Sequence, residues 1–406
     1  MNIIELIILE KRLKKLVKNI KIKQSQLQEG EYIKLSDDLI KLLYFDKRTE
    51  ILRISEDLSL NGIDLSGFSF YNIDLSKICF DGAKISEVNF EGSKGAQINP
   101  QTVGNKDLKN TKFVNVKFIG SFDGANIEGT SFKGSTDAKI DPQTIKEKNC
   151  SNVDFADVEI IGSFDDCEIC GAYFRGSTGA QINPQTVKDK NCSNVDFGGV
   201  KIIGLFDDCI IEGSWFENSI GAKINPQTIK DKNCSHVNFG NVEIIGPFDD
   251  CLIAFSNFKG SKGAQINPQT VKGKKCSHID FADVEFVGPF DGCYIICSNF
   301  KGSKGAKINP QTVEDKSLIH VNAADVEFVG PFDGCFLYAT SFEKSTGAII
   351  NPQTLLMKSC ISVNFADVEI IETFENCNTE YAKVEGIKGL YINFDKNRDQ
   401  THSLIK

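Results

Sequence analysis

The sequence predicts an all-β solenoid preceded by a short helical segment, and two periodicities carry this prediction. The tetrapeptide Asn-Pro-Gln-Thr, or its Asp variant, recurs every 42 residues, so one unit is repeated along the chain. Within the unit, apolar residues recur every five positions, which fits neither a helix nor a simple strand. Because repeats of constant length stack on their neighbours, we expect a coil that turns a corner every five residues.

Residues 1–58 are predicted to form a helical N-terminal segment that covers the first coil. One apolar seam has helical steps of three and four residues, and it consists of Leu6, Leu9, Leu13, Leu16 and Ile20. Residues 30–58 are expected to be helical in part, with Ser36 to Asp38 as a helix start. The seam could instead join two copies of the chain or lie on a membrane surface. Glu5 interrupts the apolar run, which argues against a secretory signal.

Residues 59–377 carry the five-residue rhythm, and residues 378–406 are expected to form an irregular C-terminal cap and tail. The rhythm is clearest where the recurring apolar residues are Leu65, Phe70, Leu75, Phe80, Ile85 and Phe90. This pattern resembles the pentapeptide-repeat family, whose loose consensus is A-[DN]-L-x-x. The resemblance implies a right-handed quadrilateral β-helix in which four pentapeptides form one square coil.

Seven 42-residue units follow from about residue 93, and each should contain two coils. The tetrapeptides begin at Asn99, Asp141, Asn183, Asn225, Asn267, Asn309 and Asn351. In each unit one side of a coil is a residue short, and another side carries three extra residues. Asn or Asp is a good helix N-cap and Pro is favoured at the first helical position, so the tetrapeptide should begin a single helical turn at a corner.

Phenylalanine and cysteine, with 30 and 14 copies, are assigned to the interior of the coil. The main aromatic column contains Phe113, Phe132, Phe155, Phe174, Phe197, Phe216, Phe239, Phe258, Phe281, Phe300, Phe342 and Phe365, with Ala323 as the exception. One cysteine column contains Cys150, Cys192, Cys234, Cys276 and Cys360. The other contains Cys167, Cys209, Cys251, Cys293, Cys335 and Cys377.

Neighbours within one cysteine column are expected to lie about 10 Å apart, beyond the reach of a disulfide. A cross-pair such as Cys167 with Cys192 is not excluded by distance alone. Since Leu318 replaces one column member while Cys335 remains, an obligate bridge is disfavoured. We interpret the cysteines as small buried hydrophobes in a reducing compartment, which predicts a cytoplasmic protein.

Charged residues also recur once per unit, and they are the candidate partner-binding residues. The acidic column contains Asp123, Asp165, Asp207, Asp249, Asp291 and Asp333, with Glu375 in the last unit. The basic column contains Lys106, Lys148, Lys190, Lys232, Lys274, Lys316 and Lys358. We expect the two columns at different edges of the coil. The alternative is that one solvated turn was duplicated, because charges about 10 Å apart are largely screened.

No constellation of catalytic residues, cofactor motif or metal-ligand spacing stands out, so the sequence predicts neither an enzyme nor a bound cofactor. His236, His278 and His320 are 42 residues apart, hence about 10 Å from each other, too far to share a metal ion. The formal charge of −9 argues against direct binding to nucleic-acid phosphates. No stretch is long and apolar enough for a transmembrane segment.

The leading functional hypothesis is a non-catalytic repeat scaffold that binds a macromolecular partner, an as yet unknown protein, along its surface. Solenoids expose extended faces suited to this purpose. The family resemblance implies an alternative, in which an acidic coil mimics DNA and inhibits or protects a type II topoisomerase. Two further alternatives are a secreted effector and a self-assembling structural protein.

Overall fold

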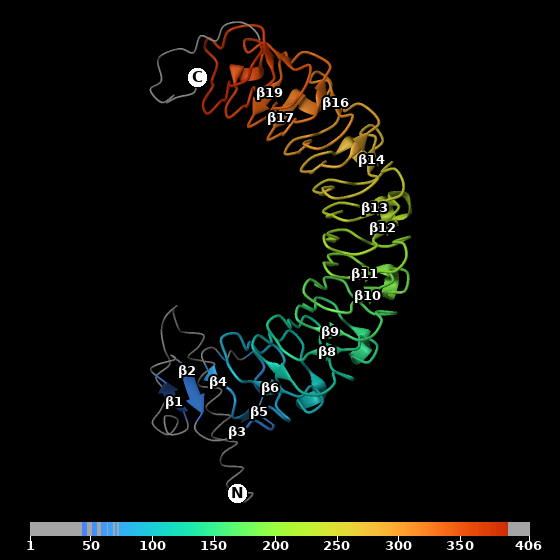
Figure 1. Cartoon of the computed structure of the whole chain (residues 1–406), viewed down its shortest axis with the longest axis vertical. Coiled ribbons are helices and arrows are strands. Elements are labelled where there is room, and N and C mark those ends of the chain that lie inside the picture. Colours follow the sequence, from blue (N-terminus) through green and yellow to red (C-terminus); the bar gives the residue numbers. More distant parts are fainter. Residues whose placement is uncertain are drawn as a thin grey trace, which may run out of the picture. The chain divides into compact units, whose positions relative to one another are not determined.

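The computed structural model describes residues 43–46, 51–54, 58–62, 64–67, 70 and 73–388. This part of the chain is a β-solenoid of about 14 turns with almost no helix, which confirms the predicted all-β coil. It consists of two compact units, whose boundary lies at residues 191–202. Within each unit, Figure 1 shows successive turns stacked on one another, with the short strands recurring on the same side.

The strands are short, and each turn of the solenoid contributes only one or two of them. They are β1 (Leu43–Asp46), β2 (Ile51–Ile54), β3 (Leu58–Ser59), β4 (Ile73–Asp74), β5 (Ile78–Cys79), β6 (Gln97–Ile98), β7 (Lys117–Phe118), β8 (Lys139–Ile140), β9 (Glu159–Ile160), β10 (Gln181–Ile182), β11 (Lys201–Ile202), β12 (Lys223–Ile224), β13 (Glu243–Ile244), β14 (Gln265–Ile266), β15 (Glu285–Phe286), β16 (Lys307–Ile308), β17 (Ser317–Ile319), β18 (Glu327–Phe328), β19 (Phe336–Tyr338), β20 (Ile349–Ile350) and β21 (Glu369–Ile370). The 3-10 helices are η1 (Gly104–Lys106), η2 (Lys146–Lys148), η3 (Lys188–Lys190), η4 (Pro226–Thr228), η5 (Lys230–Lys232), η6 (Lys272–Lys274), η7 (Glu314–Lys316) and η8 (Leu356–Lys358).

Parallel pairing between successive turns holds each unit together. In the first unit β8 pairs with β9, with Lys139 opposite Glu159. In the second unit β12 pairs with β13, and single bridges join the other sides, as in Trp215 with Asn238 and Asn238 with Asn257. These last partners are 23 and 19 residues apart, so longer and shorter turns alternate. The alternation follows from the sides with extra or missing residues.

The corners are tight turns in which one residue adopts positive φ. Asn, Asp and Gly tolerate this conformation best, and they fill most of these positions. At Gly179, with φ +78°, an added Cβ would lie 2.4 Å from the carbonyl oxygen of Ile160 on the preceding turn. Only glycine fits there, because a backbone atom occupies the space that a side chain would need.

The interior is filled by the predicted aromatic column and by a second column packed against it. Phe155 and Phe174 stack with ring centroids 5.1 Å apart, and Phe239 and Phe258 with centroids 4.9 Å apart. A second phenylalanine meets each such pair edge-on, as Phe164 meets Phe174 at 5.1 Å. These contacts confirm that the phenylalanine surplus forms the core, and they combine stacked with edge-to-face geometry.

The cysteines also lie where the repeat predicts, and all 14 are free thiols. Both columns are buried except for Cys377, which is half-buried. Hydrogen bonding to Cys251 and burial raise the pKa of the Cys234 thiol. Burial raises the pKa of Cys335 to about 12. The raised pKa favours the protonated thiol at Cys234 and Cys335, whereas hydrogen bonding to Cys234 lowers the pKa of Cys251.

The two ends differ from the prediction. Within residues 30–58, β1 and β2 form an antiparallel hairpin, and β2 adds to β4 with Leu52 opposite Ile73. The expected helix is therefore wrong over these strands, because β1 pairs with β2 and β2 pairs in turn with β4. At the other end, bridges continue to Lys388, beyond the predicted boundary at residue 377. The Leu6–Ile20 seam and the tail after Lys388 lie outside the described residues.

Candidate functional site

The Asn-Pro-Gln-Thr segments form a polar edge that recurs once per repeat. Asn225 caps η4 by accepting a hydrogen bond from the backbone N–H of Gln227 at 3.1 Å, and Pro226 occupies the first helical position. In the Asp variant, Asp141 accepts from Gln143 N–H at 3.0 Å. The predicted capped turn is thus confirmed, as a tight turn that is a regular 3-10 helix in the Asn225 copy.

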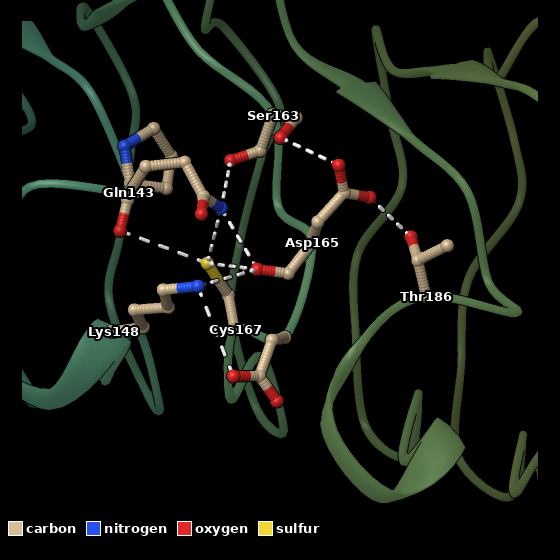
Figure 2. A network of polar contacts seen from close by, with 8 residues as sticks. Gln143, Lys148, Ser163, Asp165, Cys167 and Thr186 are labelled. Atoms are coloured by element: carbon tan, nitrogen blue, oxygen red, sulfur yellow. Dashed lines mark hydrogen bonds and ion pairs between the residues drawn. The ribbon is translucent and has the colours of Figure 1, made fainter.

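The glutamine of each segment reaches the following turn and binds its backbone. Gln143 Nε2 donates to the carbonyl oxygens of Ser163 and Asp165 at 2.9 and 2.8 Å, as Figure 2 shows. Equivalent pairs of bonds are made by Gln101, Gln227, Gln269, Gln311 and Gln353. This side chain replaces backbone pairing at a corner, so two turns are held together by an amide group.

The acidic column accepts hydrogen bonds from its own turn and from the following one. Asp165 accepts from Ser163 Oγ at 2.9 Å and from Thr186 Oγ1, in the next repeat, at 2.5 Å (Figure 2). The Thr186 bond, followed by the Ser163 bond, lowers the pKa of the Asp165 carboxyl. The Thr144 bond does the same for the pKa of Asp123. The carboxylates are therefore part of the framework that joins repeats.

The basic column lies at the same edge, so the expectation of two separate charged edges is wrong. Lys106 Nζ donates to the Asp123 carbonyl oxygen at 3.1 Å, and Lys274 Nζ donates to that of Asp291 at 3.0 Å. Each lysine precedes its aspartate by 17 residues, slightly less than one turn, which brings them together on adjacent turns. Lys274 also donates to Gln269 Oε1 at 2.9 Å.

The sequence reasoning named the Asp and Lys columns but missed the Gln and Thr that complete this edge. The signal was present, since both residues are unchanged in all seven tetrapeptides. A side chain repeated without drift has a partner that is repeated as well. We call the Asn (or Asp), Gln and Thr side chains of the seven tetrapeptides, together with the acidic and basic columns, the polar edge.

The exposed side chains of the strands form ion pairs between turns. Lys139 pairs with Glu159 at 2.8 Å, and Lys223 with Glu243 at 2.9 Å. Lys307 and Glu327 form a third such pair at 3.0 Å. All are half-exposed, so each contributes little to stability. Their effect is to leave this face with both signs of charge rather than one.

Beside these ion pairs lies a column of exposed aliphatic side chains, which the sequence reasoning did not identify. One follows the strand in each repeat, and 45–60% of its surface is exposed. The members are Ile119 and Ile161 in the first unit and Ile203, Ile245, Val287, Val329 and Ile371 in the second. Side chains alternate along a strand, so the residue after a buried one points outward. We call this set the aliphatic column.

One corner of the second unit carries exposed aromatic side chains. Phe255 is stacked between His236 and His278, with ring centroids 4.8 and 4.5 Å away. His236, Phe255 and Trp215 border a shallow depression of about 670 Å³ over Gly213. The His236 and His278 rings are separated as predicted, because the Phe255 ring lies between them.

Within the described residues, no group of three or more His, Cys, Asp and Glu side chains is arranged to hold a metal ion. In that part of the chain there is also no helix with the length and apolar character needed to cross a membrane.

Comparisons with known proteins gave no sequence relative. No protein-family model and no curated protein matches this chain. Among solved structures, it is similar to HetL, a pentapeptide repeat protein involved in heterocyst differentiation regulation from the cyanobacterium Nostoc, with 10% identity and a TM-score of 0.11 over 67% of this chain and 85% of that one. It is also similar to full-length QnrB1, a plasmid-mediated fluoroquinolone resistance protein, with 14% identity and a TM-score of 0.11 over 56% of this chain and 89% of that one.

These similarities are too low to carry an argument, and the fold rests on the five-residue rhythm and on the parallel pairing of successive turns. The chain is a parallel β-solenoid with a five-residue rhythm that resembles that of pentapeptide-repeat proteins. Its seven capped corners and the glutamine at each of them distinguish its polar edge from a plain series of pentapeptides.

Proposed function

We propose that the protein is a non-catalytic repeat scaffold that binds a protein partner through the aliphatic column. The observation that carries the proposal is the recurrence of a half-exposed Ile or Val at the same place in all seven repeats. Single exposed apolar residues are ordinary, but a series of them along one face is typical of interaction surfaces.

The polar edge is a less suitable surface for a partner than the aliphatic column. Its carboxylates and lysines are already engaged with side chains and backbone of neighbouring turns, as in Thr270 with Asp249 and Lys274 with Asp291. A partner would have to replace these hydrogen bonds, whereas covering Ile245 or Val287 only removes apolar surface from water. Burial of such surface contributes about 25 cal/mol per Å².

The alternative of a DNA mimic that acts on a type II topoisomerase is not favoured by the charges of this chain. Such a mimic needs a face of one sign, but Lys223 pairs with Glu243 and Lys307 with Glu327 on the strand face. We expect the purified protein to leave the supercoiling activity of a bacterial gyrase unchanged at micromolar concentration. Inhibition or protection there would favour the alternative over a scaffold.

The test is affinity capture from the source cell with the full chain and with the variant Ile245→Asp/Val287→Asp/Val329→Asp. A matched control, Asn238→Asp/Asn257→Asp/Asn322→Asp, adds three charges on another side of the turns while keeping a side-chain oxygen acceptor. We expect a captured protein to be lost with the first variant and retained with the control. Retention with both would contradict the proposal, and capture of only further copies of the chain would favour self-assembly.

A further inference from the structure

We propose that the depression over Gly213 is a binding site for an arginine side chain supplied by a protein segment. Its border consists of Asn194, Glu212, Gly213, Trp215, His236 and Phe255, all in the second unit. Three features of these residues define the ligand: an open ring face, an indole beside it, and a carboxylate without a counter-ion. The inference rests on the proposed function only in taking the ligand from a protein partner.

The depression exists because one corner column changes from small to aromatic residues at this point. Asn194, Gly213, His236 and Phe255 occupy the same corner of four successive turns, as the bond from His236 N–H to Ala254 O illustrates. An added Cβ at Gly213 would lie 2.2 Å from Asn194 Oδ1, so the amide folds over the glycine. Asn194 has a short side chain and Gly213 has none, so the space beside the His236 ring is left open.

The aromatic stack leaves one planar surface available. Phe255 covers one face of His236 at 4.8 Å with an interplanar angle of 4°. Among the described residues, no ring is stacked on the opposite face, which adjoins Gly213. Phe255 adopts φ +63°, a conformation that is unfavourable for a bulky residue by about 1–3 kcal/mol. His236 and His278 at the same corner also adopt positive φ, so the corner imposes this conformation, and the open face of His236 is the feature that marks the site.

The charge of the ligand follows from Glu212. Its carboxylate accepts one hydrogen bond, from Asn233 Nδ2 at 2.9 Å, and has no ion-pair partner among the described residues. In the first unit the equivalent Glu128 is paired with Lys109 at 2.8 Å, but Ser193 takes the place of that lysine beside Glu212. The site around Glu212 therefore has an exposed negative charge that its counterpart lacks.

A guanidinium group matches this combination better than other cations. It is planar, so it can stack on the open face of His236, and it has several N–H donors for Glu212 and for Asn194 Oδ1. Its aliphatic stem can lie against Trp215, half of whose surface is exposed. An ammonium group would satisfy the carboxylate but would not use the flat ring.

The experiment uses Trp215 as its reporter, because the chain contains a single tryptophan. The full-length protein is titrated with acetyl-Gly-Arg-Gly-amide while the indole fluorescence is recorded. Two other ligands are titrated separately for comparison. One is the same peptide with citrulline, which has the same shape as arginine without the charge, and the other is cellotriose. We expect saturation in the millimolar range with the arginine peptide and at least a tenfold weaker response with the other two.

Two variants decide whether the signal comes from the proposed contacts. Glu212→Gln should weaken the arginine peptide about tenfold, as expected for loss of a charge-assisted hydrogen bond. Glu128→Gln, the matched change in the first unit, should leave the affinity within twofold. An unchanged affinity in Glu212→Gln, an equal response to citrulline, a response to cellotriose alone, or no saturation would each overturn the site. None of these results bears on capture through the aliphatic column, so the two proposals can fail separately.

Discussion

The polar edge and the aliphatic column recur with the same period but have opposite chemistry. At the polar edge, every repeat uses the same Gln and Thr, and these side chains bind neighbouring turns, as Gln269 binds Pro289 and Asp291. The aliphatic column consists of five Ile and two Val residues and leaves about half of each residue in solvent. The difference teaches that strict repetition of a polar residue in a solenoid indicates an internal partner.

The lesson for function is that the most regular charges of this chain are the least available ones. Asp165 and Lys148 are bound within the edge (Figure 2), although their periodicity first suggested a charged docking surface. The aliphatic column, in contrast, leaves about half of each residue exposed to solvent. The predictions that follow separate the two regions by their effects on stability.

The largest effect on stability should come from the glutamine of the polar edge. In Gln269→Ala, the Pro289 carbonyl oxygen loses this donor and the Asp291 carbonyl oxygen keeps only Lys274, so we expect unfolding to become easier by about 2 kcal/mol. Chemical denaturation measures the change. Gln265→Ala, in the exposed strand β14, is the matched control and should change stability by no more than about 0.5 kcal/mol. Equal effects at both positions would remove the special role of the edge.

A smaller loss is expected when the threonine bond between repeats is removed. Thr186→Val keeps the shape of the side chain but removes the donor to Asp165 Oδ1, which should cost about 1 kcal/mol. Thr178→Val changes an exposed threonine in the same unit and should be nearly neutral. If Thr186→Val is as stable as the natural chain in denaturant titration, the acidic column does not join repeats.

Low pH should weaken the hydrogen bond between Thr186 and Asp165. Because its pKa is lowered in the folded state, Asp165 stabilises the fold above its unfolded pKa of about 3.9, and this contribution is lost as the pH falls through the folded-state value. Asp165→Asn should therefore make the melting temperature less dependent on pH below about 4, and Thr186→Val should do so in part. A steeper dependence in Asp165→Asn would show the opposite sign of coupling.

The smallest effect should be in the aliphatic column. Val287→Ser shortens a side chain of a residue that is 57% exposed, so its effect on the free energy of unfolding should stay within about 0.5 kcal/mol. Thermal melting of this variant beside the natural chain is sufficient. A loss of 2 kcal/mol or more would mean that the column is part of the core rather than a free surface.

Much of the fold could be predicted from the sequence because the five-residue rhythm specifies which side chains point inward. Phe155 and Phe174 stack as expected, since the repeat places them at the same position of adjacent turns. The hairpin of β1 and β2 could not be predicted, because it depends on the pairing of β2 with β4, a contact that local helical propensity does not contain.

The candidate site was harder to predict because it depends on the exact length of each side. Lys148 and Asp165 were predicted at different edges, but their separation of 17 residues brings them to one corner of adjacent turns. Ile161 was overlooked because it follows Ile160, a buried residue, and two neighbouring apolar residues were treated as one core position. Alternation along the strand was the signal that would have separated them.

The most direct test measures the dissociation constant of the captured partner for two triple variants of the second unit. Ile245→Asp/Val287→Asp/Val329→Asp changes the aliphatic column, and Asp249→Asn/Asp291→Asn/Asp333→Asn removes three charges of the polar edge while keeping an acceptor for each threonine. We predict that the first variant binds about 100-fold more weakly, which corresponds to about 2.7 kcal/mol, and the second within threefold of the natural chain. Loss of binding in the second variant with retention in the first would contradict the account.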